Sequence, residues 1–199
     1  MKNFFFQIIE EIFPIVYILY KNKILKNLKK DQEIPENINS YLELNEKQLT
    51  NRLLEEHDRA SKIDDKTSKF TLALSLSLTI LSAINTIFIK LFYIKISLFT
   101  KFISILCLLS SIYMLLASII AVSAYKTLPK YGYGTDYLLE IRKMGKKAIA
   151  KNLVSQEKMN IIRHMKNEAS YQCIRNGLLL LLITFFITLI YFIINLILN

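Results

Sequence analysis

The chain has few residues that break helices and few that commonly form chemical centres. Its 199 residues include four Gly, three Pro, two Cys, two His and no Trp. So few Gly and Pro residues let long helices run without interruption. Cys107 and Cys173 share no motif spacing, which argues against a disulfide framework or a zinc site. We therefore interpret both as small buried hydrophobic residues.

Charged residues and His are missing from three long apolar runs, which cover residues 70–89, 102–125 and 177–198. A bilayer core about 30 Å thick takes roughly 20 helical residues to cross. Each run meets that length. We therefore predict an all-α integral membrane protein with three transmembrane helices, cytosolic helical extensions and an N-terminal amphipathic helix, surrounded by membrane lipid.

The net charge of +10 is unevenly distributed along the chain. Residues 126–176 carry 11 basic and four acidic side chains, whereas residues 1–69 carry 12 of each sign. The positive-inside rule places both regions in the cytoplasm, with the C-terminus outside. The abundance of Ile, Leu, Lys and Asn fits an AT-rich bacterial or archaeal genome, so we expect a cytoplasmic membrane, which in a bacterium is the inner (cytoplasmic) membrane. Topology and attraction to anionic lipid explain the basic charge without a nucleic-acid partner.

Changes in composition divide the chain into five segments. They are an interfacial amphipathic helix (1–30), a linker with a cytosolic helix (31–69), a transmembrane hairpin (70–125), a cytosolic helical segment (126–176) and a third transmembrane helix (177–199). Glu10 and Glu11 interrupt the first apolar stretch, which favours a helix lying in the interface. A fourth span over residues 4–20 is the alternative, at a cost of roughly 5 kcal/mol for two carboxylates in the bilayer.

Local patterns predict where the cytosolic helices begin. Ser40 and Glu43 form a capping-box signature, so we expect one helix from Ser40 through the first span. Its cytosolic half has an apolar stripe of near-heptad spacing: Leu42, Leu49, Leu53, Ala60 and Ile63. We expect this stripe to pack against the second cytosolic segment.

The second cytosolic segment begins with a turn over residues 131–135. The turn contains Gly-Tyr-Gly but no preceding pore helix, so it is not read as a potassium filter. We expect one helix over 136–152, packing through Leu138, Leu139, Ile141 and Ala148. Ser155 is expected to cap the next helix, which runs into the third span with an apolar face of Ile161, Ile162, Met165, Ala169 and Cys173.

Each span also carries a stripe of hydroxyl and small side chains, as placed at 100° per residue. The candidate membrane seam comprises Thr71, Ser75, Thr79, Ser82 and Thr86 on the first span, Ser104, Ser111 and Ser118 on the second, and Thr184, Thr188, Tyr191 and Asn195 on the third. Such residues line helix contacts in lipid, within or between subunits. In the alternative, an oligomer opens one seam to water as a poorly selective pore.

The search for a catalytic centre gives no candidate. The Ser and Thr residues of the spans have no activating base beside them. His57 and His164 would need a carboxylate and a close approach of two helices to hold a metal ion. We interpret the basic cluster at 142–147 as a patch that faces solvent or lipid. A phosphate-binding site is the alternative, although no glycine-rich loop supports it. We expect no enzymatic activity, no cofactor and no metal.

A short motif precedes the first span: Arg59, Asp64, Lys66 and Thr67. With this motif, the Ala-rich end of the second span before Pro129 and the segment 167–176, the chain resembles small bacterial transmembrane effectors of anti-phage systems. These are the Pycsar transmembrane effector family and the related SLATT families. The resemblance covers roughly residues 51–199, and Thr67 stands where those families usually have Ala.

The resemblance implies an effector that senses a partner protein or a cyclic nucleotide, forms a homo-oligomer and perturbs the inner membrane of an infected cell, causing growth arrest. The cytosolic helices would receive the signal and the spans would act on the membrane. The alternative is a non-toxic accessory or scaffold membrane protein that binds a cytosolic or membrane partner through its cytosolic helices.

Overall fold

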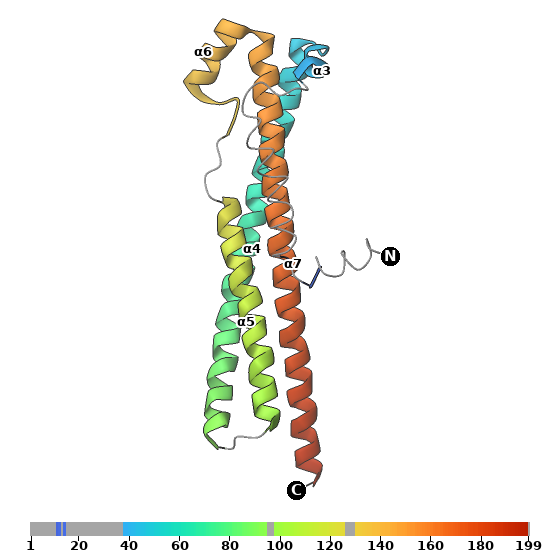
Figure 1. Cartoon of the computed structure of the whole chain (residues 1–199). Helices are drawn as coiled ribbons and strands as arrows, with labels where there is room; N and C mark the ends of the chain where they lie inside the picture. The colour runs from blue at the N-terminus through green and yellow to red at the C-terminus, as the bar shows by residue number, and fades with distance from the viewer. Residues whose placement is uncertain (1–10, 13, 15–37, 95–97, 126–129, 199) are drawn as a thin grey trace, which may run out of the picture. The chain divides into compact units, whose positions relative to one another are not determined.

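The computed structural model describes residues 11–12, 14, 38–94, 98–125 and 130–198, without the side chains of residues 85, 87–94, 125, 195 and 198. All its longer elements are α-helices (Figure 1): α3 (Ile38–Leu42), α4 (Glu46–Ile94), α5 (Leu98–Tyr125), α6 (Gly134–Met144) and α7 (Lys146–Leu198). The predicted all-α class is thus confirmed for the described part. The amphipathic helix expected over residues 1–30, or its alternative as a span, lies outside the described residues except for positions 11, 12 and 14.

Three of these helices, α4, α5 and α7, are long and apolar enough to cross a membrane, as the sequence predicted. The chain divides into two compact units. Unit 1 comprises Met1–Pro14, Lys69–Val122 and Ala169–Asn199, and unit 2 comprises Ile15–Ser68 and Ser123–Glu168. Helices α4 and α7 each contribute residues to both units.

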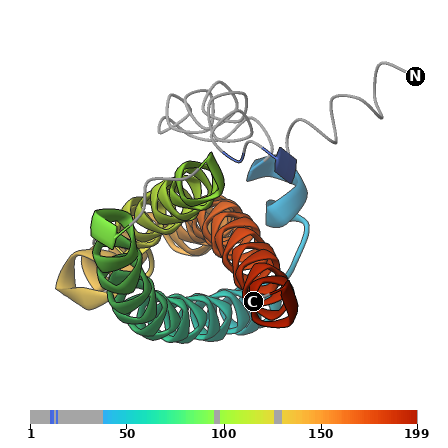
Figure 2. The same cartoon turned by 90° about the horizontal axis from the view of Figure 1, so that it is seen from below.

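Unit 1 consists of three neighbouring helical segments from α4, α5 and α7, seen end-on in Figure 2. Its interior combines large apolar residues such as Leu74, Leu81 and Ile103 with small ones such as Ala117. Helices α5 and α7 approach closely at Gly177, where an added Cβ atom would lie 3.2 Å from the Met114 Cε atom. Small residues at such points let helix backbones come together, because no side chain separates them.

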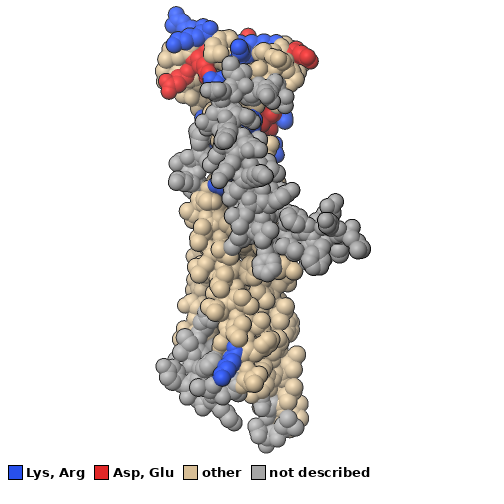
Figure 3. All heavy atoms as spheres, in the orientation of Figure 1, with Lys and Arg blue, Asp and Glu red and all other residues tan. Residues whose placement is uncertain are grey.

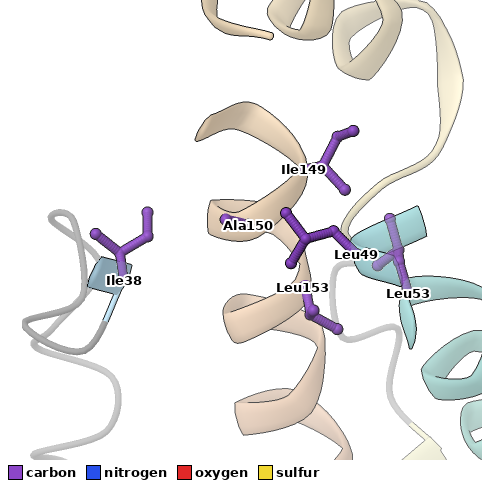
Figure 4. Packing of buried hydrophobic residues seen from close by; sticks show 6 residues of the cluster. All are labelled: Ile38, Leu49, Leu53, Ile149, Ala150 and Leu153. Carbon is purple, nitrogen blue, oxygen red and sulfur yellow. The ribbon is translucent and has the colours of Figure 1, made fainter. Parts of the chain in front are cut away.

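Unit 2 has a compact apolar core (Figure 4). Leu49 and Leu53 of α4 pack with Ile149, Ala150 and Leu153 of α7 and with Ile38 of α3, and Tyr137 and Ile141 of α6 lie against them. Buried members of the stripe predicted on α4 are Leu49, Leu53, Ala60 and Ile63. The near-heptad pattern therefore identified the inner face of α4 in this unit.

The start of α4 differs from the prediction. Helix α3 ends at Leu42, and α4 begins at Glu46, so no single helix runs from Ser40. The capping box is formed by Asn45 and Gln48: the Gln48 N–H donates to Asn45 Oδ1 at 2.8 Å, and the Asn45 N–H donates to Gln48 Oε1 at 2.9 Å. An Asn cap with a reciprocal Gln satisfies two helix-end donors at once, which is why the helix starts there.

The second half of the chain also breaks at a different place. Helix α6 ends before Gly145, whose φ of 55° is a conformation that L-residues rarely adopt, and α7 then runs unbroken from Lys146. The expected helix over 136–152 is therefore two helices, and Ser155 lies inside α7 rather than at a cap. The Gly residue ends the helix because a residue without a Cβ atom adopts this backbone geometry at little cost.

Candidate functional site

The buried surface of α7 in unit 2 includes a polar stripe beside the apolar core residues Ile149, Ala150 and Leu153. Five of its side chains are no more than 7% exposed and recur every three or four residues, a spacing that places them on one helix face: Asn152, Gln156, Asn160, Arg163 and Asn167. We call this set the polar ladder. Polar side chains are rarely buried without partners, so each was traced to the groups that it contacts.

A carboxylate lies at the centre of the ladder. Glu56 of α4 is 2% exposed, and the Asn160 side-chain amide donates to its backbone O and to its Oε2 atom, both at 2.8 Å. Gln156 Nε2 in turn donates to Asn160 Oδ1 at 3.0 Å. Arg52 and Arg59 each bring a guanidinium nitrogen to 3.4 Å from Glu56 Oε1. The buried charge is therefore both hydrogen-bonded and paired, as burial requires.

Further along α4, the residues of the sequence motif meet the other end of the ladder. Asp64 lies 3.8 Å from Arg163 Nη1 and 3.8 Å from Lys130 Nζ. The Thr67 hydroxyl is 2.9 Å from Asn167 Oδ1, and Asn167 Nδ2 donates to the Ile63 carbonyl at 3.3 Å.

Two of the four motif residues thus contact α7 within unit 2. Arg59 pairs with Glu56 on its own helix, and Lys66 lies exposed on α4. The motif joins α4 to the polar ladder through Asp64 and Thr67, which fixes the register of the two helices at this point.

The turn before α6 is held by the ladder. The Tyr131 N–H donates to Gln156 Oε1 and the Gly132 N–H donates to Asn152 Oδ1, each at 3.0 Å. His57 Nε2 lies 2.8 Å from the Tyr131 carbonyl, a geometry in which this nitrogen donates. The His57 ring also stacks on Tyr133 at a centroid distance of 3.8 Å.

Gly132 is required in this turn for two reasons. Its φ is +78°, and an added Cβ atom would lie 2.8 Å from a Leu53 methyl carbon. The Gly-Tyr-Gly sequence is therefore a turn anchored to unit 2, in agreement with the sequence-based interpretation.

Three further polar contacts lie within unit 2. Lys151 Nζ and Asn152 Nδ2 each donate to the Glu140 carboxylate at 2.9 Å, and these bonds lower the pKa of Glu140. The Tyr41 hydroxyl donates to Glu157 Oε2. Burial and the neighbouring Glu157 carboxylate raise the pKa of Tyr41 to about 12, so this hydroxyl stays protonated at neutral pH.

The membrane seam residues have different surroundings on different helices of unit 1. On α4 all five are exposed: Thr71, Ser75, Thr79, Ser82 and Thr86. The side chains that α4 buries in the unit are Leu74 and Leu81, on another part of its surface. The Thr79 hydroxyl donates to the Ser75 carbonyl at 2.9 Å, one helical turn back. The α4 stripe is therefore an outer surface of unit 1.

On the other two helices the seam lies nearer the interior. Ser104, Ser111 and Ser118 of α5 and Thr188 of α7 are partly exposed, and Thr184 is buried. Tyr191 stacks on Phe99 at a centroid distance of 3.8 Å. The side chain of Asn195 lies outside the described part. The sequence analysis missed Ser110 of α5, which is fully buried and donates to the Gly177 carbonyl at 2.8 Å.

The polar ladder was also missed. The sequence predicts an apolar face on this part of α7; Ile162, Ala169 and Cys173 are buried as expected, but Ile161 is 43% exposed. A signal was present in the sequence, because Asn152, Gln156, Asn160, Arg163 and Asn167 recur at helical spacing. A search restricted to apolar residues could not detect it.

The arrangement provides helix pairing rather than an evident reaction centre. His57 contacts the Tyr131 carbonyl of the turn, and His164 is exposed. The described residues contain no group of three His, Cys, Asp or Glu side chains placed to hold a metal ion. The charges that surround the ladder gather over unit 2, whereas the surface of unit 1 in Figure 3 is mostly uncharged. Comparison of the chain with protein-family models, with curated proteins and with solved structures finds no match.

Proposed function

We propose that this chain is a membrane effector of bacterial anti-phage defence, which forms homo-oligomers on an upstream signal and perturbs the inner membrane. In this proposal α4, α5 and the C-terminal half of α7 cross the bilayer, unit 2 is cytosolic and the C-terminus is outside. The resemblance through Arg59, Asp64, Lys66 and Thr67 suggests the defence role. The signal is a partner protein or a cyclic nucleotide, received by unit 2.

The single observation that carries the proposal is the exposed hydroxyl stripe of α4. Ser75, Thr79 and Ser82 lie on the outer surface of an otherwise apolar unit, within the span. Small and hydroxyl residues let transmembrane helices approach closely and add interhelical hydrogen bonds. A second copy of the chain would cover the stripe, and a ring of copies would place it beside a water-filled opening.

Unit 2 supports the proposal because specific polar contacts define how its helices pair. Buried polar groups such as Glu56 and Asn160 fix one helix register and penalise intermediates in which they lose their partners. A signal that favours another pairing of α4 with α7 would therefore change the unit in a discrete step.

The proposal is tested by membrane potential and growth after tightly controlled expression of the full chain in bacteria. We expect rapid depolarisation followed by growth arrest. The variant Ser75→Leu/Thr79→Leu should abolish both effects, because bulky side chains prevent close helix approach. The matched control is Leu72→Ile/Leu76→Ile, which changes two exposed apolar residues of the same helix and should leave both effects intact.

Two outcomes would count against the proposal. Normal potential and growth, with the chain present in the membrane and its neighbouring genes co-expressed, would contradict the effector function. Equal behaviour of the stripe variant and its control would remove the α4 stripe as the functional surface.

The second candidate is a non-toxic accessory or scaffold protein, which one observation favours. Thr79 and Thr86 already donate their hydroxyl protons to carbonyls of their own helix, at 2.9 Å each. The stripe then needs neither water nor a second copy to satisfy these donors. This candidate predicts tolerated expression and a stable complex with a partner.

A further inference from the structure

Helix α6 presents a second face that unit 2 leaves uncovered. Its inner side rests on the apolar core through the partly buried Tyr137 and Ile141, and none of its residues is fully buried. On the other side Leu138 is 65% exposed and Leu139 is 50% exposed. Adjacent large apolar residues at such exposure often mark an interaction site.

Unpaired cations accompany these leucines. Arg142, Lys143 and Lys147 are exposed, and within the described part of the chain none of them takes part in an ion pair. Of the two carboxylates of α6, Glu140 is held by Lys151 and Asn152, and Asp136 in the first turn is exposed. Figure 3 shows Lys and Arg side chains, with Asp and Glu side chains among them, over the end of unit 2 formed by α6 and the start of α7.

We infer that this outer face of α6 is a docking site for an acidic amphipathic helix of a cytosolic partner protein. We define the α6 face as Leu138, Leu139, Arg142 and Lys143 of α6, together with Lys147 in the first turn of α7. The partner's apolar residues would cover the two leucines, and its Asp and Glu side chains would pair with the three cations. The inference deepens the proposed function by naming a partner class, and it depends on that function only for the cytosolic location of unit 2.

The positions of the side chains favour a protein over a lipid surface. At 100° per residue, Arg142 lies about 40° from Leu138 and about 60° from Leu139, between the two leucines. A helix that enters lipid keeps its cations at the margins of a continuous apolar face. Here a cation lies within the apolar patch, where it is better matched by one carboxylate of a partner.

The charges also argue against a second copy of this chain. In a two-fold symmetric contact the same patch meets itself, so the three cations of each copy would be brought together, with the exposed Asp136 as the one free carboxylate that each α6 offers against them. Like charges brought together across an interface cost several kcal/mol. An acidic partner avoids this repulsion and steers association by opposite charge.

The experiment uses the full chain in nanodiscs of neutral lipid and a display library of helical 16-residue peptides. Polar positions of the peptides vary among Asp, Glu, Gln, Lys and Arg, and apolar positions vary among Leu, Ile, Phe, Met and Ala. We expect selection to enrich peptides of net negative charge. Their affinity should fall at least tenfold for Arg142→Glu/Lys143→Glu and for Leu138→Ala/Leu139→Ala, and should weaken as salt is raised.

Matched controls lie on α4 of the same unit. Lys62 is an exposed cation and Leu54 is a 56% exposed leucine, so Lys62→Glu and Leu54→Ala should leave peptide affinity unchanged. The inference is overturned if no peptide is enriched, if enriched peptides show no negative bias, or if the controls weaken binding equally. It is also overturned if the α6 variants reduce only the binding of phosphatidylglycerol vesicles or only self-association. This experiment measures peptide affinity and not toxicity. The docking inference can therefore be wrong while the effector function is correct, and the effector function can be wrong while the docking inference is correct.

Discussion

The two units bury different kinds of residue in their interiors. Unit 1 encloses apolar and small side chains, and its buried polar groups are the hydroxyls of Ser110, Ser170 and Thr184 among those described. Unit 2 encloses a carboxylate, a guanidinium and several amides. In unit 1, α5 and α7 are joined by the close approach at Gly177 and by two hydroxyl–carbonyl hydrogen bonds, whereas unit 2 joins α4 to α7 through charged and amide side chains. Loss of a partner is therefore expected to cost more in unit 2, because one of its buried groups is a carboxylate.

The largest effect is expected from removing the central amide of unit 2. Asn160→Leu removes one hydrogen bond to the buried Glu56 carboxylate and one to the Glu56 backbone carbonyl, which together should cost about 3 kcal/mol. Hydrogen exchange of the full chain in detergent would detect this as faster exchange in residues 46–68, with unit 1 unchanged. The control Asn51→Leu changes an exposed amide of α4 and should have little effect. Unaltered exchange in Asn160→Leu would show that Glu56 does not depend on this partner.

The corresponding change in unit 1 is Gly177→Val. The added carbons would meet Met114 and the Ser110 carbonyl, which lie 3.2 Å and 3.3 Å from even a single Cβ atom. Overpacking of this kind should cost about 2 kcal/mol. We expect faster exchange in α5 and in the second half of α7 but not in residues 46–68. Leu178→Val, at a partly exposed neighbouring position, is the control; an equal effect there would rule out close approach as the cause.

A smaller effect is expected where the sequence motif meets the polar ladder. Thr67→Val keeps the shape of the side chain but removes the hydroxyl that contacts Asn167, at a cost of about 1 kcal/mol. A double-mutant cycle with Asn167→Ala, followed by thermal unfolding in detergent, would isolate the coupling. Additive effects of the two changes would show that the hydroxyl and the amide do not stabilise each other.

The smallest effect concerns acid. Hydrogen bonds from Lys151 and Asn152 lower the pKa of Glu140 in the folded unit. The stability that these bonds contribute is fully present above the ordinary carboxyl pKa of about 4.3. It is lost as the pH falls through the lower pKa of the folded state. Glu140→Gln should remove about 0.5 kcal/mol of stability at neutral pH. The same substitution should also make the unfolding temperature depend less on pH at the acid end, as measured by thermal unfolding between pH 3 and 7. An identical acid limb in both proteins would contradict this role.

The sequence predicted the helical class, the three apolar helices and the inner face of α4 because each of these depends on a local, periodic pattern. Leu49, Leu53, Ala60 and Ile63 could be assigned by spacing alone. The start of α4 and the break at Gly145 were misplaced, because Ser40 and Asn45 are both competent caps and the choice between them depends on tertiary contacts. The polar ladder could not be predicted by hydropathy, since its stability depends on partners about 100 residues away.

That separation has a consequence for the order of events during synthesis. Glu56 and Asn160 are 104 positions apart, and so are Ile63 and Asn167. A ribosome that has made α4 and α5 has made Arg52 and Arg59, which pair with the buried Glu56 carboxylate, but not yet Asn160, which donates a hydrogen bond to it. Contacts that join distant parts of a chain form late, because the intervening segment must first be present and closed into a loop. Unit 2 can therefore assemble only after most of the chain has been made. A chain cut short before residue 160 has the first two apolar helices but cannot form the network that pairs α4 with α7.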